Sequence, residues 1–205
     1  MENIIKELNL PFTPEAIFVS NSHHKSVLTR YCAENAEHGC KIIHGQYGGS
    51  YGQWDMHWLE KYYKSISDYY LTWGWKDHDN TYPLGMLRPL GSIRKKIKKC
   101  DQLLLIGKTI KSYGYSLDSN SGACQSKNYL NDCFLAINNL REDIKENLTI
   151  RLKPVGKGWN EKERFEDLLS PKKIDMGEES IFSVIEKTKI YFATYNGTGY
   201  LESLA

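Results

Sequence analysis

The feature that most constrains the fold is an alternation between short apolar segments and longer amphipathic ones. Three segments rich in β-branched or aromatic residues have the length of strands, at 16–21 (AIFVSN), 41–45 (KIIHG) and 69–75 (YYLTWGW). The two segments between them, 24–39 and 57–68, have apolar residues at helical spacing. This βαβαβ order predicts a parallel sheet, because parallel strands need helical crossovers.

The same alternation restarts after residue 100. Strand-length segments occur at 101–107, 148–154, 173–177 and 189–196, and helix-length segments at 126–143, 160–169, 180–188 and from 197 onward. Proline, glycine and a basic run separate the two series. We therefore predict an α/β protein of two Rossmann-like parallel-sheet units, at 1–93 and 94–205.

The end of the chain bears on the second unit. Ala205 falls within the first turns of the predicted helix that begins at residue 197. A doubly wound sheet normally continues through more strands and helices that cover both of its faces. We therefore expect the C-terminal unit to be truncated and the chain to be a fragment.

Charge argues against a nucleic-acid partner. Lys plus Arg number 27 and Asp plus Glu number 25, so the formal charge is +2, and binding through phosphates needs a stronger basic field. The one basic run is RKKIKK, Arg94 to Lys99. A solvated face or a linker is the favoured interpretation of this run, and a peripheral membrane contact is the alternative.

The apolar runs, the N-terminal segment and the cysteines together predict a cytoplasmic protein with reduced thiols. No apolar run approaches the length of a spanning helix, and the N-terminal segment lacks the features of a secretory signal. The five cysteines are odd in number and form no C-x-x-C pair, which argues against a disulfide framework or a zinc site.

His44 stands where an apolar strand opens into a glycine-rich segment. Ligands of open parallel sheets bind at the carboxyl ends of strands, and a neutral imidazole there suits a general base. The alternative is a structural histidine at a turn. His23 and His24 follow the first strand and share the layer, but their spacing to His44 and His57 matches no metal-ligand pattern, so no metal is expected.

Arg151 and Lys153 alternate with Ile150 and Leu152 along a predicted strand. Period-two alternation places both cations on one side of the sheet near its carboxyl end. They could clamp phosphates, with a bidentate fork from arginine and a point charge from lysine. An edge strand with a solvated face is the alternative.

The segment Asn196 to Thr198 joins the last predicted strand to a helix. Backbone N–H groups at a helix start favour an anion, and the side chains of Asn196 and Thr198 add donors. The alternative is that one of them only caps the helix. Glu202 lies one turn further on, where it could accept from a ribose, or merely compensate the helix dipole.

Four motifs together resemble one family. HGQYGGSYGQ (44–53), LTWGW (71–75), IRLKPVGKGWNEKERFEDL (150–168) and TYNGTGYLESLA (194–205) occur in the order found in the surface-carbohydrate transferases of bacterial lipopolysaccharide O-antigen clusters. These are relatives of the two-domain GT-B glycosyltransferases and of the glycerophosphate polymer transferases. The resemblance implies a GT-B-like pair of units.

The resemblance also implies an activity. It predicts a cytoplasmic transfer, at the inner face of the membrane, of a sugar or polyol phosphate from a nucleotide-sugar donor to a lipid-linked or glycan acceptor, without a metal or cofactor. The implied site residues are the base His44 and, for the donor nucleotide, Arg151, Lys153, Asn196, Thr198 and Glu202. Two alternatives stay open: a nucleotide-sugar epimerase of the same fold, and a non-catalytic remnant or binding module.

Overall fold

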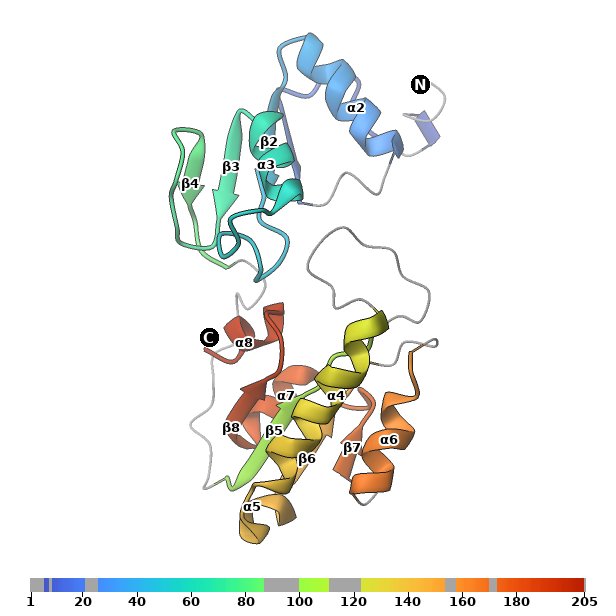
Figure 1. The fold of residues 1–205 in the computed structure, drawn as a ribbon. Coiled ribbons are helices and arrows are strands. Elements are labelled where there is room, and N and C mark those ends of the chain that lie inside the picture. The colour runs from blue at the N-terminus through green and yellow to red at the C-terminus, as the bar shows by residue number, and fades with distance from the viewer. Residues whose placement is uncertain are drawn as a thin grey trace. The chain divides into compact units, whose positions relative to one another are not determined.

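A computed structural model describes residues 6–7, 9–20, 26–86, 100–110, 123–153, 158–169 and 173–204. The chain forms two compact units, 1–90 and 91–205, and each contains one parallel sheet (Figure 1). The predicted α/β class with two Rossmann-like parallel-sheet units is therefore confirmed. The predicted boundary at 93/94, the basic run 94–99 and the histidine pair at 23–24 lie outside the described residues.

The first unit is a four-stranded parallel sheet in the order β1-β2-β3-β4. Its elements are β1 (Ala16–Val19), α2 (Ser26–Glu37), β2 (Lys41–Gly45), α3 (Trp58–Ser65), β3 (Tyr69–Thr72) and β4 (Thr81–Pro83). The sequence did not predict β4, because a three-residue strand carries almost no pattern. Residues 73–80, which join it to β3, contain no helix, although parallel neighbours are usually joined by one.

The core of the first unit lies on one face of this sheet. Ile17, Val19 and Ile42 pack with Tyr31 of α2, and Tyr70 packs with α3. Strands that follow chain order with right-handed crossovers place their helices on the same side. Alternate residues point to the opposite side, where Phe18, Tyr69 and Tyr82 are exposed among the residues that the structure describes.

The second unit is a parallel sheet in the order β7-β6-β5-β8. Its elements are β5 (Gln102–Ile106), α4 (Ala123–Asn138), α5 (Glu142–Glu146), β6 (Leu148–Arg151), α6 (Glu161–Leu168), β7 (Ile174–Asp175), α7 (Ile181–Glu186), β8 (Thr188–Ala193) and α8 (Thr198–Glu202). The predicted helix 126–143 is in fact two helices, since α4 ends at Asn138 and α5 begins at Glu142.

The strand order of the second unit creates a topological switch point. From β5 the chain moves outward to β6 and then β7, and it returns to the other side of β5 with β8. The loops that leave β5 and β8 therefore diverge at the carboxyl edge of the sheet. In open α/β sheets, the crevice at such a point is where ligands bind.

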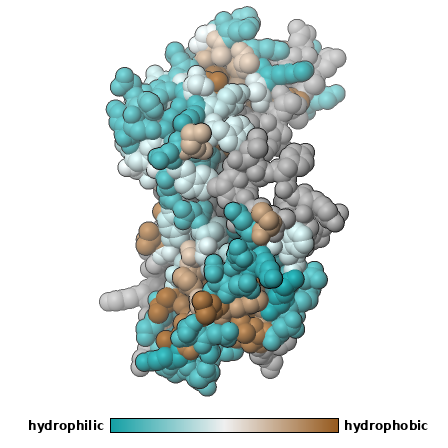
Figure 2. All heavy atoms as spheres, in the orientation of Figure 1, coloured by the Kyte–Doolittle hydropathy of each residue, from teal (hydrophilic) through white to brown (hydrophobic). Residues whose placement is uncertain are grey.

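The core of the second unit packs between this sheet and helices α4 and α6. Leu105 and Ile150 of the sheet contact Leu130 of α4 and Phe165 of α6 in one buried cluster. Apolar residues also reach the surface of this unit in the space-filling view (Figure 2). Phe192 of the edge strand β8 pairs with Leu105 in register, so it points to the same side, yet it is 45% exposed.

Candidate functional site

The carboxyl ends of β5 and β8 are tied together by a chain of hydrogen bonds. Thr194 Oγ1 donates to the carbonyl of Ile106 at 2.7 Å, and the Tyr129 hydroxyl lies 2.7 Å from Thr194 Oγ1. The backbone N–H of Lys108 donates to the Tyr129 oxygen at 2.7 Å. Because the hydroxyl proton of Thr194 is donated to the Ile106 carbonyl, Tyr129 must be the donor in its bond with Thr194. Burial raises the pKa of Tyr129 well above its usual range, which keeps that proton in place.

A cation from the loop after β5 and an aromatic ring from the loop after β8 lie close together at this edge. Lys108 Nζ lies 5.9 Å from the ring centroid of Tyr195. A Cβ at Gly197 would lie 2.6 Å from the Tyr195 ring, so the ring packs directly on the Gly197 backbone. Helix α8 begins at Thr198 with Gly197 as its N-cap. Neither Asn196 nor Thr198 therefore occupies the cap position, which removes the structural role considered for them.

Glu202 is buried on α8 and lies near Tyr191 of β8. Burial raises the pKa of Tyr191 to about 12, and the nearby carboxylate of Glu202 adds to the effect. The hydroxyl of Tyr191 also fills the space beside Gly199, where a Cβ would lie 2.4 Å from its oxygen. The predicted contact of Glu202 with a ribose stays a prediction.

Arg151 is placed one strand away from the switch point, on β6. Its Nη1 lies 2.6 Å from Asp175 Oδ2, and its Nη2 donates to the carbonyl of Glu179 at 2.9 Å. Lys153 is exposed, and its carbonyl accepts from Thr109 Oγ1 at 3.1 Å. The described contacts of Arg151 thus hold the β7 side of the sheet, and the phosphate clamp stays a prediction.

His44 lies between the first sheet and helix α3. Its ring stacks on Tyr63 with a centroid distance of 4.6 Å, and its side chain is only 1% exposed. Nδ1 lies 2.7 Å from Ser67 Oγ, and since that hydroxyl donates to the Tyr63 carbonyl, Nδ1 carries the proton. Burial lowers the pKa of His44 to about 4. These contacts are those of a packed neutral histidine, and its role as a base stays a prediction.

Two glycines near His44 are explained by aromatic rings of the same unit. A Cβ at Gly45 would lie 2.9 Å from Phe18 Cζ. Gly52 has φ of +75°, and a Cβ there would lie 2.5 Å from Trp75. These positions therefore need glycine for packing and for backbone conformation, whether or not a substrate approaches.

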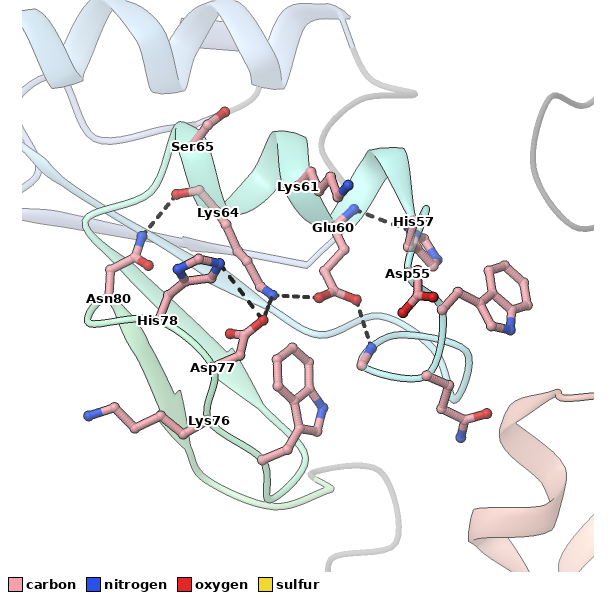
Figure 3. A pocket seen from close by; sticks show the side chains of 14 residues that line it. Asp55, His57, Glu60, Lys61, Lys64, Ser65, Lys76, Asp77, His78 and Asn80 are labelled. Atoms are coloured by element: carbon pink, nitrogen blue, oxygen red, sulfur yellow. Dashed lines mark hydrogen bonds and ion pairs between the residues drawn. The ribbon is translucent and has the colours of Figure 1, made fainter.

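The first unit contains a cavity of about 760 Å³, which we call the α3 pocket; it lies between residues 52–57, helix α3 and residues 75–80 (Figure 3). Lys64 is at its centre, with Nζ 2.5 Å from both Glu60 Oε1 and Asp77 Oδ2. Glu60 Oε2 accepts from the backbone N–H of Gly52 at 2.7 Å, and Asp77 Oδ1 accepts from the Thr81 hydroxyl at 3.1 Å. The network thus joins the three segments around the pocket.

Aromatic residues complete the lining of the α3 pocket. Lys64 Nζ lies 4.6 Å from the Trp75 ring centroid, and Trp54 stacks on His57 with a centroid distance of 5.2 Å. His57 in turn caps α3, with Nδ1 accepting from the N–H of Glu60 at 3.3 Å. Among these residues only His57 was considered from the sequence, as a metal ligand, and its position as a helix cap differs from that role.

A second cavity, of about 310 Å³, lies at the carboxyl ends of β2 and β3, with Tyr47 and Trp73 in its lining. Gln46 orders this edge, because its Oε1 accepts from the N–H of Trp73 at 2.9 Å and from Trp75 Nε1 at 3.0 Å. The same side chain donates to the carbonyl of Gly48 at 2.9 Å. One buried amide therefore fixes both loops that leave these strands.

Sequence reasoning missed Lys108, Tyr129 and the Glu60–Lys64–Asp77 network. Lys108 had a signal, since it follows a buried apolar strand directly. Glu60 and Lys64 have the i, i+4 spacing of an ordinary surface pair, and Asp77 is distant in the sequence, so nothing local marked them. Tyr129 reaches the crevice from α4 through tertiary packing alone.

Two further properties hold for the described part of the chain. Within it, no three His, Cys, Asp or Glu side chains gather as a metal ion would require. No described helix combines the length and the apolar character needed to cross a membrane.

The sequence matches a known protein family over almost its whole length. Residues 2–205 match the LIC12162 family transferase. Among curated proteins, no sequence matches the chain. The match confirms the coarser part of the resemblance, that of a transferase, and because it extends over nearly all 205 residues, the chain belongs to the LIC12162 transferase family.

Proposed function

We propose that this transferase moves a sugar, or a related polyol phosphate, from a nucleotide-activated donor to a glycan or lipid-linked acceptor of the cell envelope. The observation that carries the proposal is the strand order β7-β6-β5-β8, which creates a switch point between β5 and β8. Nucleotides bind at such points in open α/β sheets. Two Rossmann-like units also fit a GT-B-like enzyme.

The chemistry around the switch point supports a nucleotide ligand. Lys108 supplies a cation for a phosphate, and Tyr195, 39% exposed, supplies a ring on which a base can stack. Asn196 follows in the same loop, and Thr198, which carries a hydroxyl, is the first residue of α8. The hydrogen bonds through Tyr129 hold this loop against the end of β5, which pre-organises the crevice.

Arg151 and His44 could take part in the reaction only after a local rearrangement of the structure. Arg151 can reach a phosphate only by exchanging its ion pair with Asp175 for that ligand. His44 can act as a base toward an acceptor hydroxyl only if α3 moves away from its ring. Glu202 would accept from the ribose of the donor. The enzyme would act on the cytoplasmic side of the membrane, where residues 94–99 would provide a peripheral contact.

Calorimetric titration of the chain with UDP, GDP, CDP and ADP tests the proposal. At least one of them should give saturable heat. The variant Lys108→Gln should weaken that binding by about tenfold or more, the usual effect of losing a hydrogen bond to a charged group. Lys189→Gln is the matched control. Lys189 is an exposed cation near the amino end of β8, and the crevice lies at the carboxyl end of that strand. Absence of heat with all four nucleotides contradicts the proposal.

A further inference from the structure

We infer that the α3 pocket of the first unit binds the ring of a neutral sugar. The pocket is formed by residues 52–80 alone and uses no group of the nucleotide crevice. The inference rests on the proposed function only in that such a sugar would belong to the acceptor. Its volume of about 760 Å³ falls within the range of small-molecule sites.

The charges that line the pocket favour a neutral ligand. The lining contains three lysines and three carboxylates. These charged residues are Lys61, Lys64, Lys76, Asp55, Glu60 and Asp77. A phosphate would meet the carboxylates, and a cation would meet the ammonium groups. A molecule with several hydroxyls can donate to the carboxylates and accept from the ammonium groups, so it gains from both.

The polar groups are already held in place before any ligand arrives. Lys64 is fixed between Glu60 and Asp77 and has a side chain only 10% exposed. Asn80, also in the lining, donates from Nδ2 to the carbonyls of Lys64 and Ser67 at 2.9 and 3.2 Å. A ligand that binds here does not have to order these side chains, which reduces the entropic cost of binding.

Two indole rings supply the apolar part of the lining. Trp54 and Trp75 are both half-buried, and both line the pocket. A sugar ring has an apolar C–H face in addition to its hydroxyls, and an indole offers a large rigid surface for such a face. Figure 3 shows the polar side chains converging from α3 and from the segment that carries Asp77. Aromatic surface beside fixed polar groups therefore suits a ligand that has both an apolar face and hydroxyls.

Saturation-transfer NMR on the full chain tests this inference. Glucose, galactose and N-acetylglucosamine are the probes, and at least one should receive saturation at its ring protons. Trp54→Ala and Asp77→Asn should each weaken binding by about tenfold or more. Trp58→Ala and Asp79→Asn are matched controls, because both residues are exposed and neither lines the pocket. Circular dichroism verifies that each variant is folded.

Three results would overturn the inference: no transfer to any of the sugars, equal binding by the pocket variants and the controls, or displacement of the sugar by inorganic phosphate. A UDP titration of the same sample reports separately on the nucleotide crevice. If UDP binds but no sugar receives saturation, only the sugar pocket is refuted. If a sugar receives saturation, loses it in the two pocket variants, and UDP does not bind, the result supports the pocket and counts against UDP as the donor nucleotide.

Discussion

Replacing Glu161 with alanine should destabilise the second unit through two backbone N–H groups. The Glu161 residue is 5% exposed, and its Oε1 accepts from the N–H of Ile110 at 3.1 Å while Oε2 accepts from the N–H of Trp159 at 3.0 Å. The first bond joins the loop after β5 to the start of α6. Removing the carboxylate leaves a buried donor without its acceptor and frees a second, partly buried one.

The expected loss follows from these two bonds. A buried N–H left without a partner costs about 1 to 3 kcal/mol, and the partly buried one costs less because water reaches it. Together we expect Glu161→Ala to lower the free energy of unfolding by about 2 to 4 kcal/mol. Glu161→Gln keeps one carbonyl oxygen as an acceptor, so it should lose about half as much.

Glu163→Ala is the matched control. Glu163 is exposed in the same first turn of α6, so its removal takes away the same favourable interaction with the helix dipole and no buried bond. It should change the free energy of unfolding by about 0.3 to 1 kcal/mol at most. Urea unfolding followed by tryptophan fluorescence measures both variants. If Glu161→Ala costs no more than Glu163→Ala, the two hydrogen bonds do not hold the loop.

Three further predictions concern the first unit. The pKa of His44 in the folded protein is about 4, below its value in the unfolded chain, so on acidification the unfolded state binds the proton first. The free energy of unfolding should therefore fall by about 3 kcal/mol between pH 6.5 and pH 4. Urea titrations across this range should show a smaller fall for His44→Gln. Lys64→Met leaves two carboxylates without their shared cation and should cost about 2 kcal/mol more than Lys61→Met in chemical unfolding, and equal losses would contradict this. Gly52→Ala should lower the melting temperature more than Gly39→Ala, since both have positive φ but a Cβ at Gly39 meets nothing within 4 Å; similar losses would mean that the loop adapts.

The sequence predicted the sheets well because apolar strands carry their own signal. The run Leu103 to Leu105 is buried throughout, as expected of a central parallel strand. The split between α4 and α5 was missed, although Glu142 and Asp143 after Arg141 are acids typical of a helix start. Apolar residues on both sides of that point hid the break.

The candidate site was harder to predict, because side-chain direction and distant contacts decide it. His44 shares a strand face with Ile42, which is buried, so alternation alone indicates that its ring points to the helices. The position at a strand end was correct, but it does not determine accessibility. Tyr129, by contrast, enters the crevice from a helix, and no local pattern could place it there.

The Thr194 to Ile106 bond also has a consequence for how the chain is made. It joins residues 88 positions apart, because among the described strands of this sheet β5 comes first in the sequence and β8 comes last. At translation rates of about 5 to 20 residues per second, that interval corresponds to about 4 to 18 s. During this time the edge of β5 that later receives β8 has no native partner, and an unpaired apolar edge is a template for strands of other chains. Synthesis of the second unit therefore passes through a period in which a chaperone that shields Leu103 to Leu105 would raise the yield of folded protein.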